Sequence, residues 1–199
     1  MMEIELNKAE DAVGCISAGK DNTPWYAIRL YTMRVYEVDD YFRQQGFSTF
    51  IPQQYDVWVD REGKRHRELK PVVRNLLFVK DSTSLQALKD AVLTDRYKMA
   101  LVKSSRLATE PARISAHEMR EFIMMCNPEI TMKLYVSEEE AKLKAGDMVT
   151  VHHGPLKGLT GRLVRKSKKY YLLKEMPGIG VMLKVSKWCC MPVGGANGQ

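Results

Sequence analysis

The sequence predicts an α+β fold in two domains, and three features of the chain support this. Residues 24–127 alternate between helical and strand-like hydrophobic periodicity, which indicates a mixed domain. Residues 144–193 contain short strand-like runs separated by turn residues, which indicates a compact β-unit. Between them, residues 128–143 include the acid-rich run Ser137-Glu138-Glu139-Glu140 and are predicted to be the linker. Residues 1–23 and 194–199 carry no sustained pattern, so we expect a flexible extension and a disordered tail.

The first domain is predicted to open with a strand and a helix. Residues 25–31 are aromatic and aliphatic β-formers, which favours a strand. Over residues 34–45, Val35, Val38 and Phe42 fall on one helical face, and Gly46 is a natural end for that helix.

A hairpin and a buried strand are predicted next. Residues 47–60 and 65–70 are strand-like on either side of the turn residues 61–64. Residues 72–80 form a short apolar run between polar residues, which is typical of a strand buried on both faces.

Two further helices follow from their capping signals. Ser82 or Ser84 can cap a helix that reaches Val92, and a strand is expected over residues 97–103. Ser115 and Glu118 form a capping box, which predicts a helix that ends at Met125 before Asn127-Pro128.

Composition favours an anionic partner and gives no sign of a metal or cofactor. The 199 residues carry a formal net charge of +7, which favours nucleic acid as a partner without showing it. Cys15, Cys126, Cys189 and Cys190 lack metal-ligand spacing, and adjacent residues of a strand point to opposite faces. No signal peptide or long apolar run is present, so we expect a cytoplasmic protein with no membrane partner and no disulfides.

The most informative stretch of the chain is residues 146–161, GDMVTVHHGPLKGLTG. It combines a turn, an alternating Val-x-Val strand, a glycine-punctuated loop and a glycine at the start of a second strand. This order of residues resembles a KOW motif, the signature of small SH3-like β-barrels. The matching residues are Gly146, Asp147, Val149, Val151, Gly154, Pro155, Lys157, Gly158 and Gly161.

Three segments of the first domain resemble the amino-terminal domain of the NusG family of transcription elongation factors. These are Trp25-Tyr26 before an aliphatic strand, Gly63-Lys64-Arg65 at the hairpin tip, and the run of residues 71–79, PVVRNLLFV. With the KOW motif, they imply a NusG amino-terminal (NGN) α/β sandwich with an antiparallel sheet, followed by a KOW SH3-like barrel. Within the family, the chain is most similar to the specialised paralogues RfaH and, in particular, UpxY.

The resemblance implies a factor that binds elongating RNA polymerase and suppresses pausing or termination in long operons, for UpxY those of surface polysaccharide synthesis. In the family, an apolar face of the first domain docks on the clamp helices of the largest polymerase subunit. The positions that match are Arg29, Val73, Leu76 and Phe78. Strand alternation puts Leu76 and Phe78 on one face and Leu77 and Val79 on the other, so we expect an exposed apolar patch, unless all four belong to the core.

The resemblance also implies contacts with upstream or non-template DNA. Basic residues gather at the hairpin, where loop-tip side chains can reach phosphates: Arg61, Lys64, Arg65 and Arg67. Arg34 and Arg43 are candidates for the non-template strand. A solvated charged hairpin with no ligand is the alternative interpretation. The KOW domain is expected to recruit the ribosome or a termination factor.

No catalytic pattern emerges, so we expect that the protein is not an enzyme. His66, His117, His152 and His153 lie near no serine or cysteine in a nucleophile motif, and residues 154–158, GPLKG, lack the ending of a phosphate-binding loop. The competing hypothesis is a KOW-containing RNA-binding or ribosome-associated protein in which the first domain is a scaffold.

Overall fold

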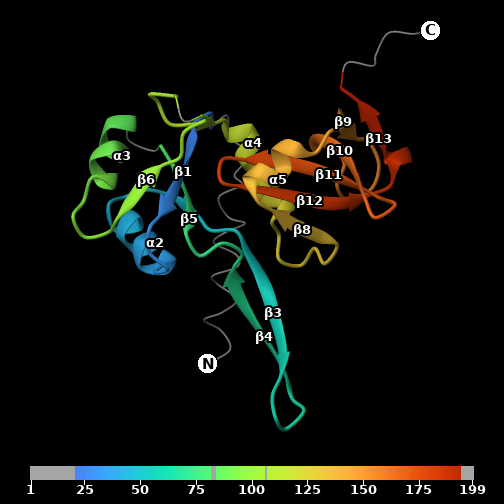
Figure 1. Cartoon of the computed structure of the whole chain (residues 1–199), viewed down its shortest axis with the longest axis horizontal. Helices are drawn as coiled ribbons and strands as arrows, with labels where there is room; N and C mark the ends of the chain where they lie inside the picture. The colour runs from blue at the N-terminus through green and yellow to red at the C-terminus, as the bar shows by residue number, and fades with distance from the viewer. Residues whose placement is uncertain (1–20, 82–83, 106, 194–199) are drawn as a thin grey trace.

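The computed structural model describes residues 21–81, 84–105 and 107–193, and it contains two antiparallel sheets and a two-stranded arm (Figure 1). The predicted extension, up to residue 20, and the predicted tail over residues 194–199 lie outside the described residues. So does Ser82, one of the two candidate helix caps.

The first sheet has five strands, all paired antiparallel. Its order is β2-β5-β1-β6, and β7 also pairs with β1. The strands are β1 (Trp25–Leu30), β2 (Thr49–Phe50), β5 (Leu76–Lys80), β6 (Met99–Leu101) and β7 (Arg113–Ile114). This confirms the predicted mixed α/β domain with an antiparallel sheet.

Helices cover both faces of this sheet. Figure 1 shows α2 (Val35–Gln44) and α3 (Leu85–Val92) on one side and α4 (Ala116–Met125) on the other. Side-chain alternation along β1 and β5 explains this, because Ile28, Leu77 and Val79 pack with α2 and α3. Ala27, Leu76 and Phe78 point to the opposite face, toward α4.

The local signals place the helix ends correctly. Val35, Val38 and Phe42 are the buried residues of α2, and Gly46 follows it at φ +84°, a conformation that glycine adopts without strain. The Ser84 side chain accepts a hydrogen bond from the Ala87 amide at the start of α3. Ser115 and Glu118 form the predicted capping box of α4.

Strand β5 begins later than predicted. The expected strand of residues 72–80 contains regular pairing only from Leu76, because residues 72–75 form the turn that leads from the arm into the sheet. The Asn75 carbonyl in this turn accepts a hydrogen bond from the Leu30 amide at 2.9 Å. The predicted strand of residues 97–103 is likewise shorter, since β6 covers Met99–Leu101.

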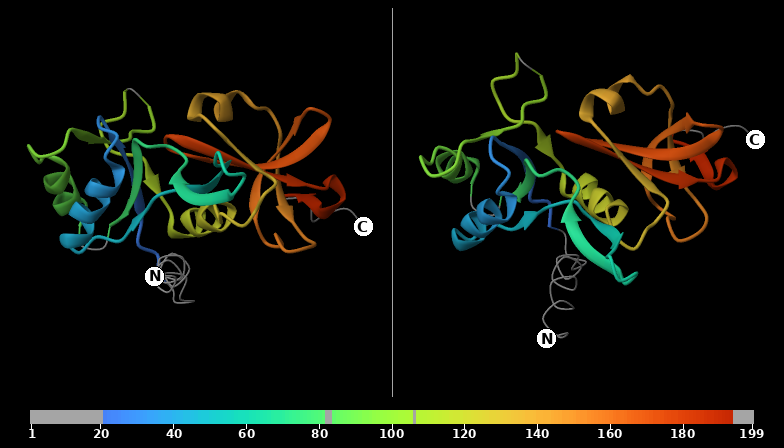
Figure 2. Two further views of the ribbon diagram at one scale, coloured as in Figure 1. Left: turned by 90° about the horizontal axis from the view of Figure 1, so that it is seen from below. Right: turned by 60° about the horizontal axis from the view of Figure 1, so that its bottom comes forward.

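The arm consists of β3 (Gln53–Val59) and β4 (Arg65–Pro71), which pair only with each other among the described residues. Figures 1 and 2 show it extending away from both sheets. Gly63 in its turn has φ +81°, as the predicted tight turn over residues 61–64 requires.

The second sheet has six strands in the order β13-β9-β10-β11-β12-β8. A 3₁₀ turn, η1 (Lys187–Cys189), precedes the last strand, and α5 (Glu138–Leu143) packs on β11 and β12. We call residues 133–193 the C-terminal unit. Its strands are β8 (Lys133–Val136), β9 (Asp147–Val151), β10 (Thr160–Lys166), β11 (Lys169–Met176), β12 (Ile179–Val185) and β13 (Cys190–Pro192).

The predicted linker of residues 128–143 is corrected by this sheet. Tyr135 pairs with Val181 of β12, so β8 is an edge strand of the C-terminal unit. The acid-rich run forms the first turn of α5, where Ser137 caps the helix and acidic side chains suit its positive end. Ala141 of α5 is fully buried on the sheet. Glu139 is exposed, whereas Glu138 is largely buried and accepts a hydrogen bond from the Gly178 amide at 2.8 Å. The acidic run therefore belongs to a packed helix, and the connection after α4 is short.

The two sheets share one hydrophobic core. It contains Phe78 of β5 and Phe122 of α4 from the first domain, and Leu172 and Val181 from the C-terminal unit. Figure 2 shows α4 between the two sheets in both views. The C-terminal unit is therefore docked on the side of the first sheet that carries α4, opposite α2 and α3.

Candidate functional site

The β5 residues that resemble the polymerase contact lie at the interface between the two sheets. Leu76 is 1% exposed, and the β11–β12 turn covers it. Gly178 in that turn has φ +90°, and a Cβ atom there would fall 2.8 Å from Leu76 Cδ1, so a side chain at this position would be strained and would displace Leu76. The half-buried Arg29 borders the same turn, with its Nη2 atom 3.6 Å from that position.

Phe78 lies deeper in the shared core, in contact with α4. Its ring lies 5.3 Å from that of Phe122 and 6.4 Å from that of Phe50, measured between centroids. Val73 is partly buried against the same core. The predicted alternation is correct, but the expected exposed apolar patch is wrong for this docked arrangement, since Leu76 and Phe78 are both buried.

A buried carboxylate on α4 holds the C-terminal unit in place. Glu121 is 5% exposed and accepts hydrogen bonds from the Thr160 amide at 2.8 Å and from the Thr160 hydroxyl at 2.9 Å. Lys174 of β11 forms an ion pair with the other carboxylate oxygen. No local signal in the sequence points to this contact, since Thr160 and Lys174 lie 39 and 53 residues from Glu121.

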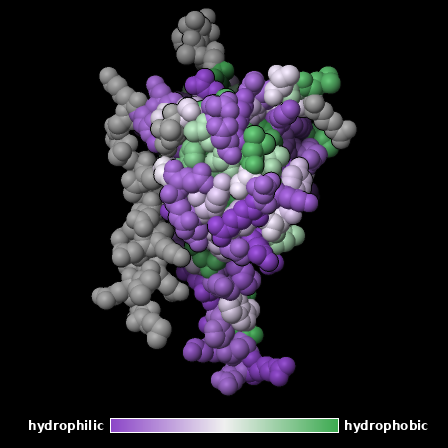
Figure 3. All heavy atoms as spheres, turned by 90° about the vertical axis from the view of Figure 1, so that its left-hand side faces the viewer, coloured by the Kyte–Doolittle hydropathy of each residue, from purple (hydrophilic) through white to green (hydrophobic). Residues whose placement is uncertain are grey.

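The arm carries a row of cations, some of them free. Arg61, Lys64 and Arg65 at its tip are exposed and form no ion pair within the described residues. On the side of the molecule that Figure 3 shows, the surface of the arm is largely hydrophilic. Arg67, by contrast, forms two 3.0 Å hydrogen bonds with Glu129, which lowers the pKa of that carboxyl.

The tip of the arm is organised by one aspartate. Asp60 accepts hydrogen bonds from the amides of Glu62 and Lys64, at 3.0 and 2.9 Å. Its second oxygen lies 2.6 Å from His66 Nε2, and this hydrogen bond is the main reason that the pKa of Asp60 is lowered. The His66 ring stacks on Trp58 at 5.4 Å. These contacts fix the loop from which Lys64 and Arg65 project.

Aromatic rings of the arm are already in contact with cations. The Arg67 guanidinium lies 3.3 Å from the centre of the Tyr55 ring, and Lys70 Nζ lies 5.0 Å from the Trp58 ring. Trp58 remains 41% exposed, so part of its ring is accessible at the surface.

Arg34 and Arg43 lie at opposite ends of α2, apart from the arm tip. Each pairs with an acidic residue of its own helix, Arg34 with Glu37 at 3.5 Å and Arg43 with Asp39 at 2.9 Å. The Arg43 side chain is 57% exposed, so its pairing leaves room for another contact.

The glycines of residues 146–161 serve the fold of the second sheet. A Cβ atom at Gly146 would lie 2.2 Å from the Leu163 carbonyl oxygen, and one at Gly161 would lie 2.6 Å from that of Leu173. Gly154 and Gly158 have φ of +85° and +93°. Val149 and Val151 are buried, whereas Asp147, Pro155 and Lys157 are exposed.

Other kinds of site find little support among the described residues. They contain no group of three or more His, Cys, Asp or Glu side chains placed to hold a metal ion. Within the same residues, no helix is long and apolar enough to cross a membrane.

A mixed α/β domain with a protruding basic arm, followed by a β-unit, agrees with the order of parts that the sequence analysis expects of a NusG-like protein. Residues 23–123 match the family model described as "Transcription termination factor nusG". The chain belongs to the NusG family, whose members act in transcription elongation and antitermination and generally bind RNA polymerase. A comparison with curated proteins finds no match.

Proposed function

We propose that this protein is a specialised elongation and antitermination factor, similar to RfaH and UpxY, that acts on long operons such as those of polysaccharide synthesis. The family match over residues 23–123 supports the general class. In this proposal the C-terminal unit is a KOW SH3-like barrel that recruits the ribosome or a termination factor. The protein acts in the cytoplasm and is not an enzyme.

The polymerase contact is proposed to use the first-sheet face that contains Leu76, with Arg29 and Val73 at its edge. Phe78 lies behind this face in the core, where it packs against Phe122. Because the turn at Gly178 lies on Leu76, the clamp helices and the C-terminal unit compete for the same surface. Polymerase binding at this face therefore requires the C-terminal unit to leave it.

The arm tip is proposed to contact upstream DNA through Arg61, Lys64 and Arg65, with Arg67 supporting the arm through Glu129. Arg34 and Arg43 are proposed to face the non-template strand. Exposed cations on a projecting hairpin can reach phosphates without any movement of the domain that carries them.

Co-purification decides between the two main hypotheses. The tagged full chain is expected to bring down RNA polymerase, and recovery of ribosomes alone would favour the RNA-binding or ribosome-associated alternative. Lys174→Ala, which removes a docking contact, is expected to increase polymerase recovery.

Adding Leu76→Ala to Lys174→Ala should reverse that gain, because truncating an anchor residue at an interface can cost about 2 kcal/mol or more of binding free energy. Leu93→Ala is the matched control, since Leu93 is 79% exposed at the end of α3, on the other side of the first sheet. Circular dichroism checks that each variant is folded. Equal recovery with Leu76→Ala and Leu93→Ala would show that the assigned face is not the contact.

The arm is tested separately by the salt dependence of binding to a transcription complex. Changing Arg61, Lys64 and Arg65 to Gln should reduce the slope of log affinity against log salt by about one for each lost phosphate contact. Arg96→Gln with Lys98→Gln and Lys103→Gln, which removes three exposed cations of the first domain, is the charge-matched control. An unchanged slope would mean that the arm tip makes no phosphate contact and is a solvated hairpin.

A further inference from the structure

One surface of the C-terminal unit is used neither by the docking contact nor by the proposed polymerase contact. It lies where β11 begins and β12 ends, together with η1. The register pairs Tyr170 with Val185 at this end and Met176 with Ile179 at the other, next to the turn that covers Leu76. These strand ends therefore lie at the end of the C-terminal unit remote from the first sheet (Figure 1).

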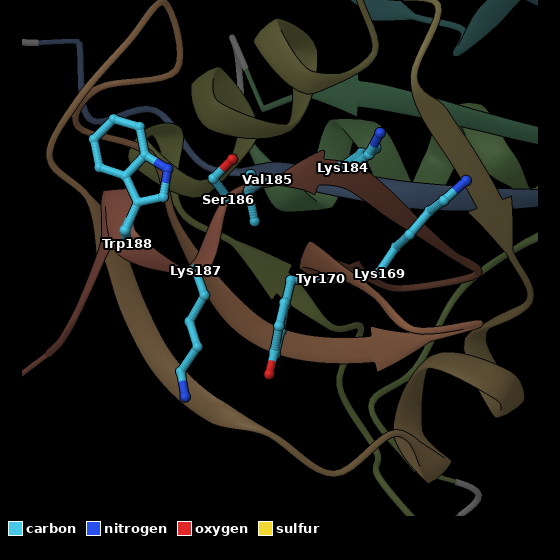
Figure 4. A pocket seen from close by; sticks show the side chains of 7 residues that line it. All are labelled: Lys169, Tyr170, Lys184, Val185, Ser186, Lys187 and Trp188. Atoms are coloured by element: carbon cyan, nitrogen blue, oxygen red, sulfur yellow. The ribbon is translucent and has the colours of Figure 1, made fainter.

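This surface is a shallow pocket whose lining includes two aromatic residues, Tyr170 and Trp188, and three lysines (Figure 4). Trp188 is 75% exposed, and the His153 ring lies 5.8 Å from it, tilted by 31°. Tyr170 is half-buried at the centre of the pocket. An indole left this exposed contributes little to the core, so most of its surface is available to a ligand.

Cations lie around the Tyr170 ring. Arg165 Cζ lies 5.7 Å and Lys187 Nζ 5.8 Å from the centre of the Tyr170 ring. Lys169 and Lys184 line the other side of the pocket, and both are exposed (Figure 4). Within the described residues, none of these four cations has an acidic partner within 4.0 Å. Over residues 148–193 the sequence has one acidic residue, Glu175, which pairs with Arg162 instead.

The turn beside the pocket contains a further cation, Lys168, at a position where the backbone conformation favours glycine. Ser167 and Lys168 connect β10 to β11 with φ of +50° and +63°. A two-residue turn of this type usually contains Asn-Gly, because both residues have positive φ. Here the second position is a lysine, which adds to the positive charge at this end of the sheet.

We propose that this surface binds single-stranded RNA. Exposed aromatic rings on which bases stack, set among unpaired cations that meet the phosphates, are the combination that single-stranded nucleic acid requires. The Tyr170 and Ser186 hydroxyls at the pocket can pair with ribose 2′-hydroxyl groups, which RNA has and DNA lacks. A factor docked on polymerase would thus hold a second contact, to the emerging transcript, through its C-terminal unit.

The test measures fluorescence anisotropy of a labelled oligouridine of about 12 nucleotides with the full chain, in the absence of polymerase. Trp188→Ala is expected to weaken binding on the order of tenfold, since one stacked base is lost. Lys184→Gln with Lys187→Gln should lower the salt slope by about 0.7 for each phosphate contact. Tyr31→Ala, a residue 69% exposed on the first domain, and Lys98→Gln with Lys103→Gln are the matched controls and should bind as the unchanged chain does.

Three results would overturn the proposal. The first is oligouridine binding that Trp188→Ala and the double lysine variant leave unchanged, or no binding at all. The second is equal affinity for oligothymidine, which would remove the assignment to RNA. The third is displacement of the RNA by polyglutamate at the same charge concentration, which would point to an acidic protein partner. Because polymerase is absent, each of these results is distinct from a failure of the polymerase contact.

Discussion

Glu121 of α4 and Lys174 of β11 form an ion pair across the boundary between the first domain and the C-terminal unit, and both side chains are almost fully buried. The Glu121 carboxylate also accepts hydrogen bonds from the Thr160 amide and hydroxyl. A buried charge is tolerated only when it is paired in this way. The position of the C-terminal unit therefore depends on the pairing of the Glu121 carboxylate.

Removing one partner of this pair should loosen the docking. Lys174→Ala leaves the Glu121 carboxylate buried without its cation, a change that costs about 3–5 kcal/mol when the group cannot reach water. Separation of the two units relieves that cost. We expect faster hydrogen exchange in α4 and β12 and faster proteolysis at residues 126–132.

The double variant Glu121→Leu with Lys174→Met is the control for this prediction. Replacing a buried ion pair by apolar residues of similar size is often neutral or stabilising, so exchange should return to the slow rate. Fast exchange in the double variant as well would mean that the pair is not what keeps the units together.

Gly178→Ala should destabilise the docked chain more than Gly154→Ala does. Both glycines have positive φ, +90° and +85°, so each alanine carries a backbone cost of about 1–2 kcal/mol. Only at Gly178 does the added methyl group meet a neighbour, Leu76 Cδ1 at 2.8 Å. Urea unfolding measures both, and the difference between the two variants isolates the contact. An equal loss of unfolding free energy in the two variants would mean that the β11–β12 turn does not contact Leu76 in solution.

The tip of the arm should lose order in acid. His66, followed by the Lys64 amide, holds the pKa of Asp60 below its ordinary value of 3.8. A group whose pKa is lowered by folding stabilises the structure above its unfolded pKa, and this contribution disappears as the pH falls through the folded value. We expect the NMR signals of the Lys64 amide to shift toward random-coil values below about pH 4. Asp60→Asn should show the disordered signals already at pH 7, and an ordered tip in that variant would contradict this role.

Cys126 should be unreactive while the chain is folded and docked. Burial raises the pKa of its thiol to about 12, so the nucleophilic thiolate is almost absent at pH 8. In a variant with Cys15, Cys189 and Cys190 changed to Ser, iodoacetamide should label Cys126 slowly, and denaturing urea should restore the rate of a free thiol. Rapid labelling without urea would show that this part of the shared core opens readily.

The elements that the sequence predicted correctly are those whose signals are local. The buried face of α2, its end at Gly46 and the capping box at Ser115 depend on residues within one or two helical turns. The alternation of Leu76 with Leu77 was also readable, because neighbouring residues of a strand always face opposite ways.

The pairing of distant segments could not be predicted in this way. Tyr135 joins the second sheet because Val181 is available beside it, and an acidic run that is typical of a linker becomes a capped helix once Ala141 has a surface to pack on. Alternation defined the apolar face at Leu76, but whether solvent, polymerase or the chain itself covers it depends on contacts such as Glu121 with Lys174. The exposed Trp188 stood out only once its neighbours in space were known.

The shortness of the connection after α4 has a consequence for any competitor of the C-terminal unit. Residues 126–132 separate the end of α4 from β8 and, at about 3.5 Å a residue, span at most roughly 25 Å. A released C-terminal unit would therefore stay close to the face it has left, at an effective concentration in the millimolar range. Polymerase would have to displace a tethered ligand rather than occupy a free surface, and lengthening this tether should ease that displacement without altering a single contact residue.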